Sequence, residues 1–272
     1  MSFIPPFTRL ALPASVSGIR RTLVEALFPP ACPACRGETA SAASLCAECW
    51  AGTLFLSGRG CSACGRDVPG LAAPGPGFLC DTCQAHPPGW DRGASVFAYE
   101  GAGRRLVLAL KHGDRLDMLA MLGPWMARAG RRLVAEADLV VPVPMHWTRR
   151  LKRRFNQSEE LARALCRAAG RADALAPRLL RRQRRTASQD GRNRAARAEN
   201  LRGAIALAPG AAAQLEGRRV LIVDDVLTTG ATFDACAAAC REAGAAGVDI
   251  LALALVSFDE APYLRSAEWA GT

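Results

Sequence analysis

The chain has 272 residues, of which 50% are hydrophobic and 22% charged, and its formal net charge is +10. A chain of this length and apolar content can bury a sizeable core, which excludes a mainly disordered protein. No apolar run reaches the roughly 18 residues that cross a bilayer, so we expect no transmembrane helix and one large or two ordinary domains.

Composition divides the chain into three zones. We expect a lead segment over 1–28 that ends in a short helix at 19–28, a small Cys-, Gly- and Pro-rich domain over 29–90, and an α/β domain over 91–272. The lead segment fits a signal peptide poorly, because prolines and arginines interrupt its apolar residues. We therefore expect a cytoplasmic protein, whose thiols stay reduced.

The third zone alternates apolar strands with amphipathic helices, which predicts a mainly parallel α/β sheet. Strands are predicted over 93–99, 138–143, 219–223 and 248–256. Helices are predicted over 104–111, 116–131, 158–169 and 231–243, and a polar, arginine-rich stretch fills 181–202.

Eight of the eleven cysteines form four pairs with the same Cys-x-x-Cys spacing. A turn of this spacing places two sulfurs on one ion, and structural zinc takes four such ligands in a tetrahedron. Eight thiolates therefore complete two zinc sites with no ligand left over. The predicted zinc ligands are Cys32, Cys35, Cys46, Cys49, Cys61, Cys64, Cys80 and Cys83.

Disulfides or a redox pair are the alternatives to zinc, and four repeats of one spacing favour the metal. The gaps between the pairs suit short hairpins, as in zinc ribbons. Pairing in chain order and crossed pairing both fit the spacing. We expect structural ions, because four thiolates leave no open position for water. The other three cysteines, Cys166, Cys236 and Cys240, are expected to be small core residues.

The segment 220–232 reads Val-Leu-Ile-Val-Asp-Asp-Val-Leu-Thr-Thr-Gly-Ala-Thr. It predicts a buried strand with Asp224 and Asp225 at its carboxyl end, where open α/β sheets bind ligands. The turn into the next helix offers backbone amides and a positive dipole to a phosphate. We expect phosphate contacts from Thr228, Thr229, Gly230, Ala231 and Thr232. Because the carboxylates can accept hydrogen bonds from sugar hydroxyls, the motif predicts a sugar 5-phosphate site, with an ordinary capped turn as the alternative.

Positive charge is concentrated in one part of the chain. Residues 141–202 hold 17 Lys and Arg against 5 Asp and Glu, a net +12, whereas the remainder sums to −2. This pattern indicates a polyphosphate pocket, a nucleic-acid-binding stripe or both, and a solvated arginine-rich surface is the plain alternative.

The paired aspartates with Thr-Thr-Gly resemble the signature loop of type I phosphoribosyltransferases, which grips the 5-phosphate of phosphoribosyl pyrophosphate (PRPP). Other motifs occur in a consistent order, namely Lys111-His-Gly-Asp114, Val141-Pro-Val-Pro144, Phe155-Asn-Gln-Ser-Glu159 and Leu201-Arg-Gly-Ala204. Together with the cysteine pairs, they resemble the ComF family of phosphoribosyltransferase-like proteins over residues 24–256.

The resemblance implies a type I phosphoribosyltransferase-like parallel sheet with helices on both faces, behind a small double zinc ribbon. Asp224 and Asp225 would hold the ribose hydroxyls of PRPP with Mg2+ nearby, and residues 228–232 would cradle the 5-phosphate.

The resemblance also assigns the basic residues. Arg149 and Arg153 would face pyrophosphate, and Lys111 lies where the family has a lysine. The stretch that holds Thr186, Gln189, Arg197 and Asn200 would form a mobile cover that excludes water during transfer.

Three functions follow as expectations. The first is a phosphoribosyltransferase that uses PRPP, linked to competence or nucleotide metabolism. The second is a non-enzymatic module that handles single-stranded DNA beside DNA-uptake proteins and keeps the PRPP pocket as a sensor or relic. The third, a scaffold that binds nothing, is disfavoured by the intact acidic pair and Thr-Gly loop.

Overall fold

The computed structural model describes residues 29–41, 43–68, 75, 77–112, 115–145, 155–184 and 203–256. The expected helix at 19–28 and the expected mobile cover at 186–200 lie outside these residues.

Four parallel strands form the central sheet in the order β1-β6-β5-β2. The outer strands are β1 (Arg92–Ala98) and β2 (Leu139–Pro142), and the central ones are β5 (Arg219–Leu227) and β6 (Gly247–Leu255). Every residue of β6 is buried. A strand that is apolar along nearly its whole length, here with Asp249 as the exception, is typical of a parallel sheet covered on both faces.

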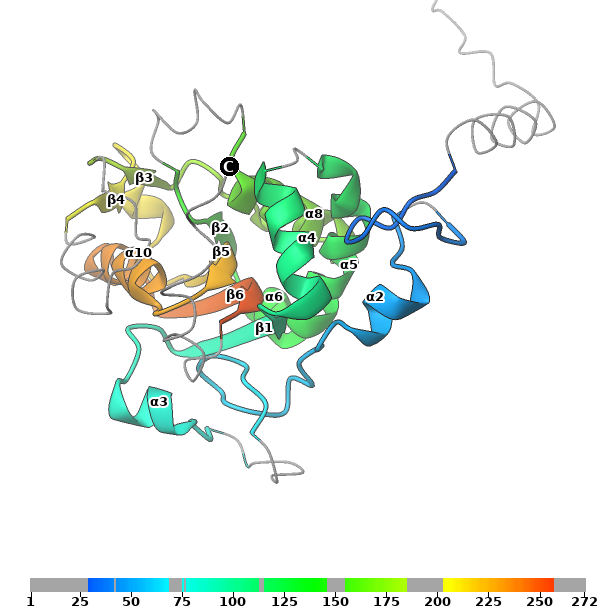
Figure 1. Ribbon diagram of the computed structural model, residues 1–272. Helices are drawn as coiled ribbons and strands as arrows, with labels where there is room; N and C mark the ends of the chain where they lie inside the picture. Colours follow the sequence, from blue (N-terminus) through cyan, green and yellow to red (C-terminus); the bar gives the residue numbers. More distant parts are fainter. Residues whose placement is uncertain are drawn as a thin grey trace, which may run out of the picture.

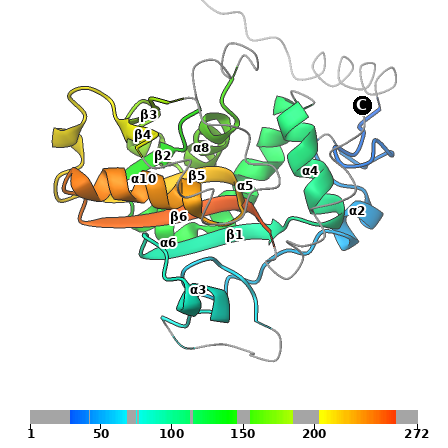
Figure 2. The same ribbon diagram turned by 60° about the vertical axis from the view of Figure 1, so that its left-hand side comes forward.

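Helices cover both faces of this sheet (Figures 1 and 2). On one face lies α10 (Ala231–Glu242), whose Phe233 belongs to the same hydrophobic core as Val220 and Ile222 of β5. The intervening residues Leu221 and Val223 face the opposite core. That core is covered by α4 (Gly101–His112), α5 (Leu119–Ala129), α6 (Arg131–Glu136) and α8 (Gln157–Ala168). The predicted α/β architecture with a parallel sheet and helices on both faces is confirmed.

Several predicted elements differ in length from the observed ones; α4, for example, begins at Gly101 and not at residue 104. The predicted strand 219–223 continues to Leu227, because β6 runs beside it and pairs as far as Leu255. The predicted helix 116–131 is divided into η1 (Leu116–Met118), α5 and α6. The break between α5 and α6 falls at Gly130, where an added Cβ would lie 2.7 Å from a methyl carbon of Leu251.

A second, smaller sheet was not predicted. Strand β3 (Leu180–Arg182), at the start of the stretch expected to be polar, pairs antiparallel with β4 (Ile205–Leu207), which follows the end of that stretch. The remaining short helices are α2 (Ala47–Ala51), α3 (Asp81–Ala85), η2 (Ala172–Ala174) and η3 (Ala212–Gln214).

The cysteine-rich segment lies along the β1 edge of the sheet (Figure 2). Phe55 forms an antiparallel bridge with Phe97, with Leu56 N–H donating to Val96 O at 3.0 Å. The ring of Phe55 also contacts Trp50 and Trp125, at centroid distances of 4.8 and 5.1 Å. The first half of the segment is thereby joined to both β1 and α5.

The second half docks on β1 through three successive carbonyls of residues 62–64. They accept hydrogen bonds from Gly93 N at 2.8 Å, Trp90 Nε1 at 2.7 Å and Ser95 Oγ at 3.2 Å. The next residue, Gly65, has a φ of 76°, and an added Cβ would lie 2.8 Å from Ser95 N. A glycine at this position therefore allows both the left-handed turn and the close contact.

We expect Gly65→Ala to destabilise the protein more than Gly210→Ala. Gly210 has a φ of 75°, and nothing lies within 4 Å of its ideal Cβ position. Both substitutions bear a left-handed strain of about 1–2 kcal/mol, and only Gly65→Ala adds a collision with β1. Chemical unfolding followed by circular dichroism measures both losses, and equal losses would contradict the close docking.

Candidate functional site

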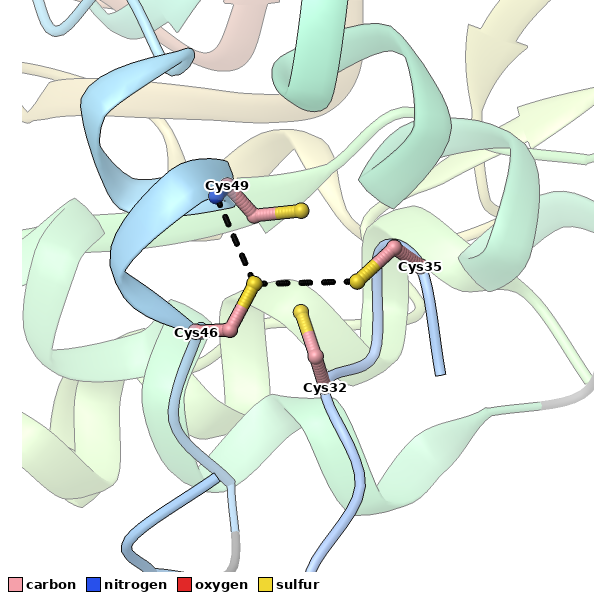
Figure 3. A group of neighbouring side chains, drawn as sticks. All are labelled: Cys32, Cys35, Cys46 and Cys49. Carbon is pink, nitrogen blue, oxygen red and sulfur yellow. Dashed lines mark hydrogen bonds between the residues drawn. The ribbon is translucent and has the colours of Figure 1, made fainter. Parts of the chain in front are cut away.

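Four cysteines from the first half of the ribbon segment converge on one point. Figure 3 shows Cys32 and Cys35 on a loop and Cys46 and Cys49 at the start of α2, with their sulfurs turned toward one another. The four sulfurs lie within 4.8 Å of one another, and Cys35 Sγ is 3.6 Å from Cys46 Sγ.

A second cluster has the same plan. It contains Cys61, Cys64, Cys80 and Cys83, whose sulfurs also lie within 4.8 Å of one another. Cys64 Sγ is 3.9 Å from Cys80 Sγ. The structure therefore pairs the cysteines in chain order and not in the crossed arrangement.

These spacings fit zinc. A tetrahedron with zinc–sulfur bonds of about 2.3 Å has sulfur–sulfur edges of about 3.8 Å, close to the 3.6 and 3.9 Å observed. All eleven cysteines are free thiols in the structure, so disulfides do not link the pairs. The donor sets fit two structural zinc ions, each held by four thiolates.

The second pair of each cluster lies at the start of a short helix, whereas a tight turn was expected for every pair. Cys46 is the N-cap residue of α2, and Cys80 is the N-cap residue of α3. Cys49 and Cys83 follow three residues later, one helical turn along. The i, i+3 spacing therefore places both sulfurs on one side of the helix.

The two clusters differ in exposure. In the first cluster Cys35 is exposed and Cys46 is half-buried, whereas all four cysteines of the second cluster are buried. Arg105 of α4 places Nη2 3.5 Å from Cys49 Sγ. A guanidinium at this position offsets part of the negative charge of a tetrathiolate site.

Away from the cysteines, polar side chains of three elements meet near the carboxyl end of β5. Lys111 Nζ of α4 is 3.2 Å from Asp225 Oδ2. Ser158 of α8 donates its hydroxyl hydrogen to Asp224 Oδ1 at 2.7 Å, and the Asp225 amide donates to the same oxygen at 2.8 Å. Neither the lysine nor the serine could be placed beside the aspartates from sequence spacing, because both are far from them in the chain.

Burial and the neighbouring charges change the protonation of this group. Burial, and after it the charge of Asp225, raises the pKa of the Asp224 carboxyl to about 7, against the opposing effect of the Ser158 hydrogen bond. Burial alone would lower the pKa of the Lys111 ammonium, but Asp225 and Asp224 outweigh it and raise that pKa. At neutral pH the group therefore holds one full cation and fewer than two full anions.

The turn at 228–232 follows directly and opens α10. Gly230 is its N-cap residue in the left-handed conformation, with φ 83° and ψ −11°. The first amides of an α-helix have no partner within the helix, and the dipole there favours an anion. Thr228, Thr229 and Thr232 are half-buried, and Ala231 is buried. The turn thus places backbone amides and threonine hydroxyls only a few residues after the acidic pair.

The basic segment predicted to bind pyrophosphate, including Arg149 and Arg153, lies outside the described residues. Both ends of that segment are described. Asn156 donates from Nδ2 to Val143 O at 3.0 Å and accepts from Ser158 N at 3.2 Å. Its side chain therefore ties the two ends together beside Asp224, to which Ser158 is bonded.

The expected mobile cover is bounded in a similar way. Gln183 N donates to Ala204 O at 2.9 Å, next to the β3–β4 pair.

The three cysteines that were expected in the core, Cys166, Cys236 and Cys240, are buried there.

Among the described residues, no helix combines the length and the apolar character that membrane spanning requires.

We expect purified protein to hold two zinc ions per chain and a chelator to remove the ion of the first cluster first. The reason is access, because Cys35 is exposed whereas the second cluster is buried. Native mass spectrometry counts the ions during chelation, and thiol alkylation followed by peptide mapping identifies the cysteines released. Earlier alkylation within residues 61–83 would contradict the expected order.

We expect Asp224→Asn to change how stability depends on pH. The folded-state pKa of Asp224 lies above its unfolded value of 3.8, so between these values the folded state binds more protons and its stability falls as pH rises. The variant does not show this loss. Its free energy of unfolding, taken relative to that of wild type, should therefore increase as the pH rises from about 4 to about 7. Urea unfolding across this range measures the difference.

Asp117→Asn is the matched control. Arg115 lowers the pKa of Asp117, so its substitution should change the pH dependence only in the acid region. Parallel wild-type and Asp224→Asn curves would contradict the raised pKa.

A family model described as a double zinc ribbon domain matches residues 23–84. The DNA utilization protein YhgH of Salmonella typhimurium is 35% identical over 217 residues, which cover 74% of this chain and 92% of that protein. YhgH of Escherichia coli K12 is 30% identical, with coverages of 82% and 88%.

Competence protein F of Haemophilus influenzae is 27% identical, with coverages of 82% of this chain and 96% of that protein. Among solved structures, phosphoribosylpyrophosphate synthetase from Mycobacterium smegmatis is 17% identical, with a TM-score of 0.30, and covers 54% of this chain and 36% of that chain. The two cysteine clusters, the parallel sheet and the identity to YhgH over most of both chains show that this chain belongs to the ComF family of competence and DNA utilization proteins.

Proposed function

We propose that the protein binds PRPP at the carboxyl end of β5 and acts as a phosphoribosyltransferase in DNA utilization. The observation that carries the proposal is the junction of an acidic pair with a helix-opening turn. Asp224 and Asp225 precede the left-handed Gly230 turn by only a few residues, and Lys111 and Ser158 hold the two carboxylates in place.

Each part of PRPP has a matching group in this arrangement. The 5-phosphate would take the amides and threonines of the 228–232 turn. The ribose hydroxyls would donate to the carboxylates of Asp224 and Asp225. Arg149 and Arg153 would receive the pyrophosphate, since guanidinium groups fork onto phosphate oxygens.

Magnesium suits the same donors. Two carboxylates and the Ser158 hydroxyl offer only oxygen, which is the ligand type that Mg2+ prefers. Asp224 and Asp225 would hold the ion, which when bound neutralises part of the charge of the pyrophosphate group. Lys111 balances Asp225 through a 3.2 Å ion pair, so the acidic pair does not repel a polyanion at full strength.

In the proposed reaction a nitrogen nucleophile forms a bond to the anomeric carbon of PRPP. The bond from that carbon to the pyrophosphate oxygen breaks, and pyrophosphate leaves with the bonding electrons. Catalysis would rest on orientation of the two reactants and on stabilisation of charge on the leaving group. The two arginines would provide that stabilisation.

A second candidate function is handling of single-stranded DNA without catalysis. It is favoured by the names of the relatives, which refer to DNA utilization and competence, and by the net charge of +12 over residues 141–202. Phosphate contacts of this kind weaken steeply with salt. DNA affinity that does not change between low and moderate salt would count against it.

We expect wild-type protein with Mg2+ to bind PRPP in isothermal titration calorimetry and Asp225→Ala to lose at least about 100-fold in affinity. Two charge-assisted hydrogen bonds account for a loss of this size. Asp117→Ala is the matched control, because it removes an exposed aspartate whose carboxylate pairs with Arg115, and it should leave the affinity unchanged.

A pyrophosphate-release assay with PRPP, Mg2+ and a panel of bases and amines, with and without single-stranded DNA, then separates catalysis from sensing. If the protein binds PRPP but releases no pyrophosphate under any of these conditions, the non-enzymatic candidate is favoured. Equal PRPP affinity in wild type and Asp225→Ala would overturn the proposed site.

A further inference from the structure

The indole of Trp90 lies between the second zinc cluster and the turn that opens α10. Trp90 is only 6% exposed, and its Nε1 donates to Ala63 O at 2.7 Å. Ala63 itself lies between the zinc ligands Cys61 and Cys64. One end of the indole is therefore fixed to the turn at residues 61–65, which carries two ligands of the second cluster and is called the second knuckle below.

The other end of the indole contacts the turn. A Cβ added to Gly230 would lie 2.7 Å from Trp90 Cη2 and 3.3 Å from Trp90 Cζ3. The indole also packs on Phe233 in the first turn of α10, with ring centroids 5.9 Å apart and planes at 61°. The face of Gly230 that a side chain would occupy is thus filled by the tryptophan.

The residues beside Trp90 are fixed to α10 as well. Gly89 N donates to Asp234 Oδ1 at 2.7 Å, and Arg241 Nε donates to Gly89 O at 3.1 Å. Arg241 also pairs with Asp91. The indole consequently has little freedom to move unless the knuckle or α10 moves with it.

We propose that Trp90 is a positioning residue through which the second zinc knuckle sets the shape of the 228–232 turn. Zinc bound at Cys61, Cys64, Cys80 and Cys83 then controls the affinity for a phosphate ester indirectly. The zinc ion does not contact the ester, and its effect passes through the contacts of Trp90 with Ala63 and Gly230. Trp90 stands at the boundary that we propose between the ribbon domain, 29–90, and the α/β domain, 91–272. The affinity part of the inference rests on the proposed function.

The test uses full-length, zinc-loaded protein and the substitution Trp90→Phe. Phenylalanine keeps an aromatic ring but lacks the Nε1 donor and the outer ring that meets Gly230. We expect PRPP affinity to fall about tenfold, the equivalent of ~1.4 kcal/mol, with two zinc ions retained. Trp125→Phe is the matched control. It alters the aromatic contacts with Trp50 and Phe55, and it should reduce stability without changing PRPP affinity.

A double-mutant cycle separates positioning from general loss of stability. Gly230→Ala adds a methyl group that collides with Trp90 Cη2 and also strains a left-handed residue. Phenylalanine at position 90 removes the collision but not the strain. Gly230→Ala should therefore cost less affinity in the Trp90→Phe background than in wild type. Additive losses, or a Trp90→Phe protein that binds PRPP like wild type, would overturn the inference.

Amide hydrogen exchange in the absence of ligand distinguishes this inference from the proposed function. Trp90→Phe should speed exchange of the first hydrogen-bonded amides of α10, from Asp234 onward, and Trp125→Phe should not. Staged chelation should leave these amides unchanged until the second zinc ion is lost. If exchange responds in this way but wild type does not bind PRPP, the proposed function fails and the positioning role stands. If wild type binds PRPP but the exchange does not respond, the positioning role fails.

Discussion

Two adjacent carboxylates at the end of a buried strand are the costly feature around which the rest of the molecule is arranged. A buried charge needs a partner or a proton, and Asp224 and Asp225 receive both kinds of help. Lys111 reaches them from α4 and Ser158 from α8, while the raised pKa of Asp224 reduces the charge. Because these partners lie on separate elements, the acidic pair is stable only when the sheet and both helices are assembled.

The zinc ribbons contact that assembly from two directions. The first cluster meets α4 through Arg105, on the same helix that carries Lys111 six residues later. The second cluster meets α10 through Trp90, at the residue that opens the helix. A segment too small to bury a core of its own would gain its order from thiolate–metal bonds. Its contacts reach α4, the helix that carries Lys111, and the turn at the start of α10.

Local patterns in the sequence predicted much of this structure. The eight-cysteine spacing, the apolar strand before the aspartates and the turn after them were recognisable because each is formed by neighbouring residues. Ser158, Arg105 and Trp90 were missed as partners because their roles depend on contacts across more than 25 residues of chain. The β3–β4 pair was missed because each strand has only three residues and the arginine-rich stretch separates the two strands in the chain. The helical geometry of Cys46 and Cys49 was missed because the same spacing also fits an isolated tight turn.

The bridge between Phe55 and Phe97 has a consequence for misfolding. An outer strand with unsatisfied amides and carbonyls can template pairing with another polypeptide. In this protein the stretch that follows the first cluster occupies Val96 O and Ala98 N. Stripping the ion from that more accessible cluster would free the stretch and expose the carboxyl-terminal end of β1, from Val96 to Ala98. Metal starvation would then promote intermolecular aggregation through this strand before the buried second cluster is disturbed.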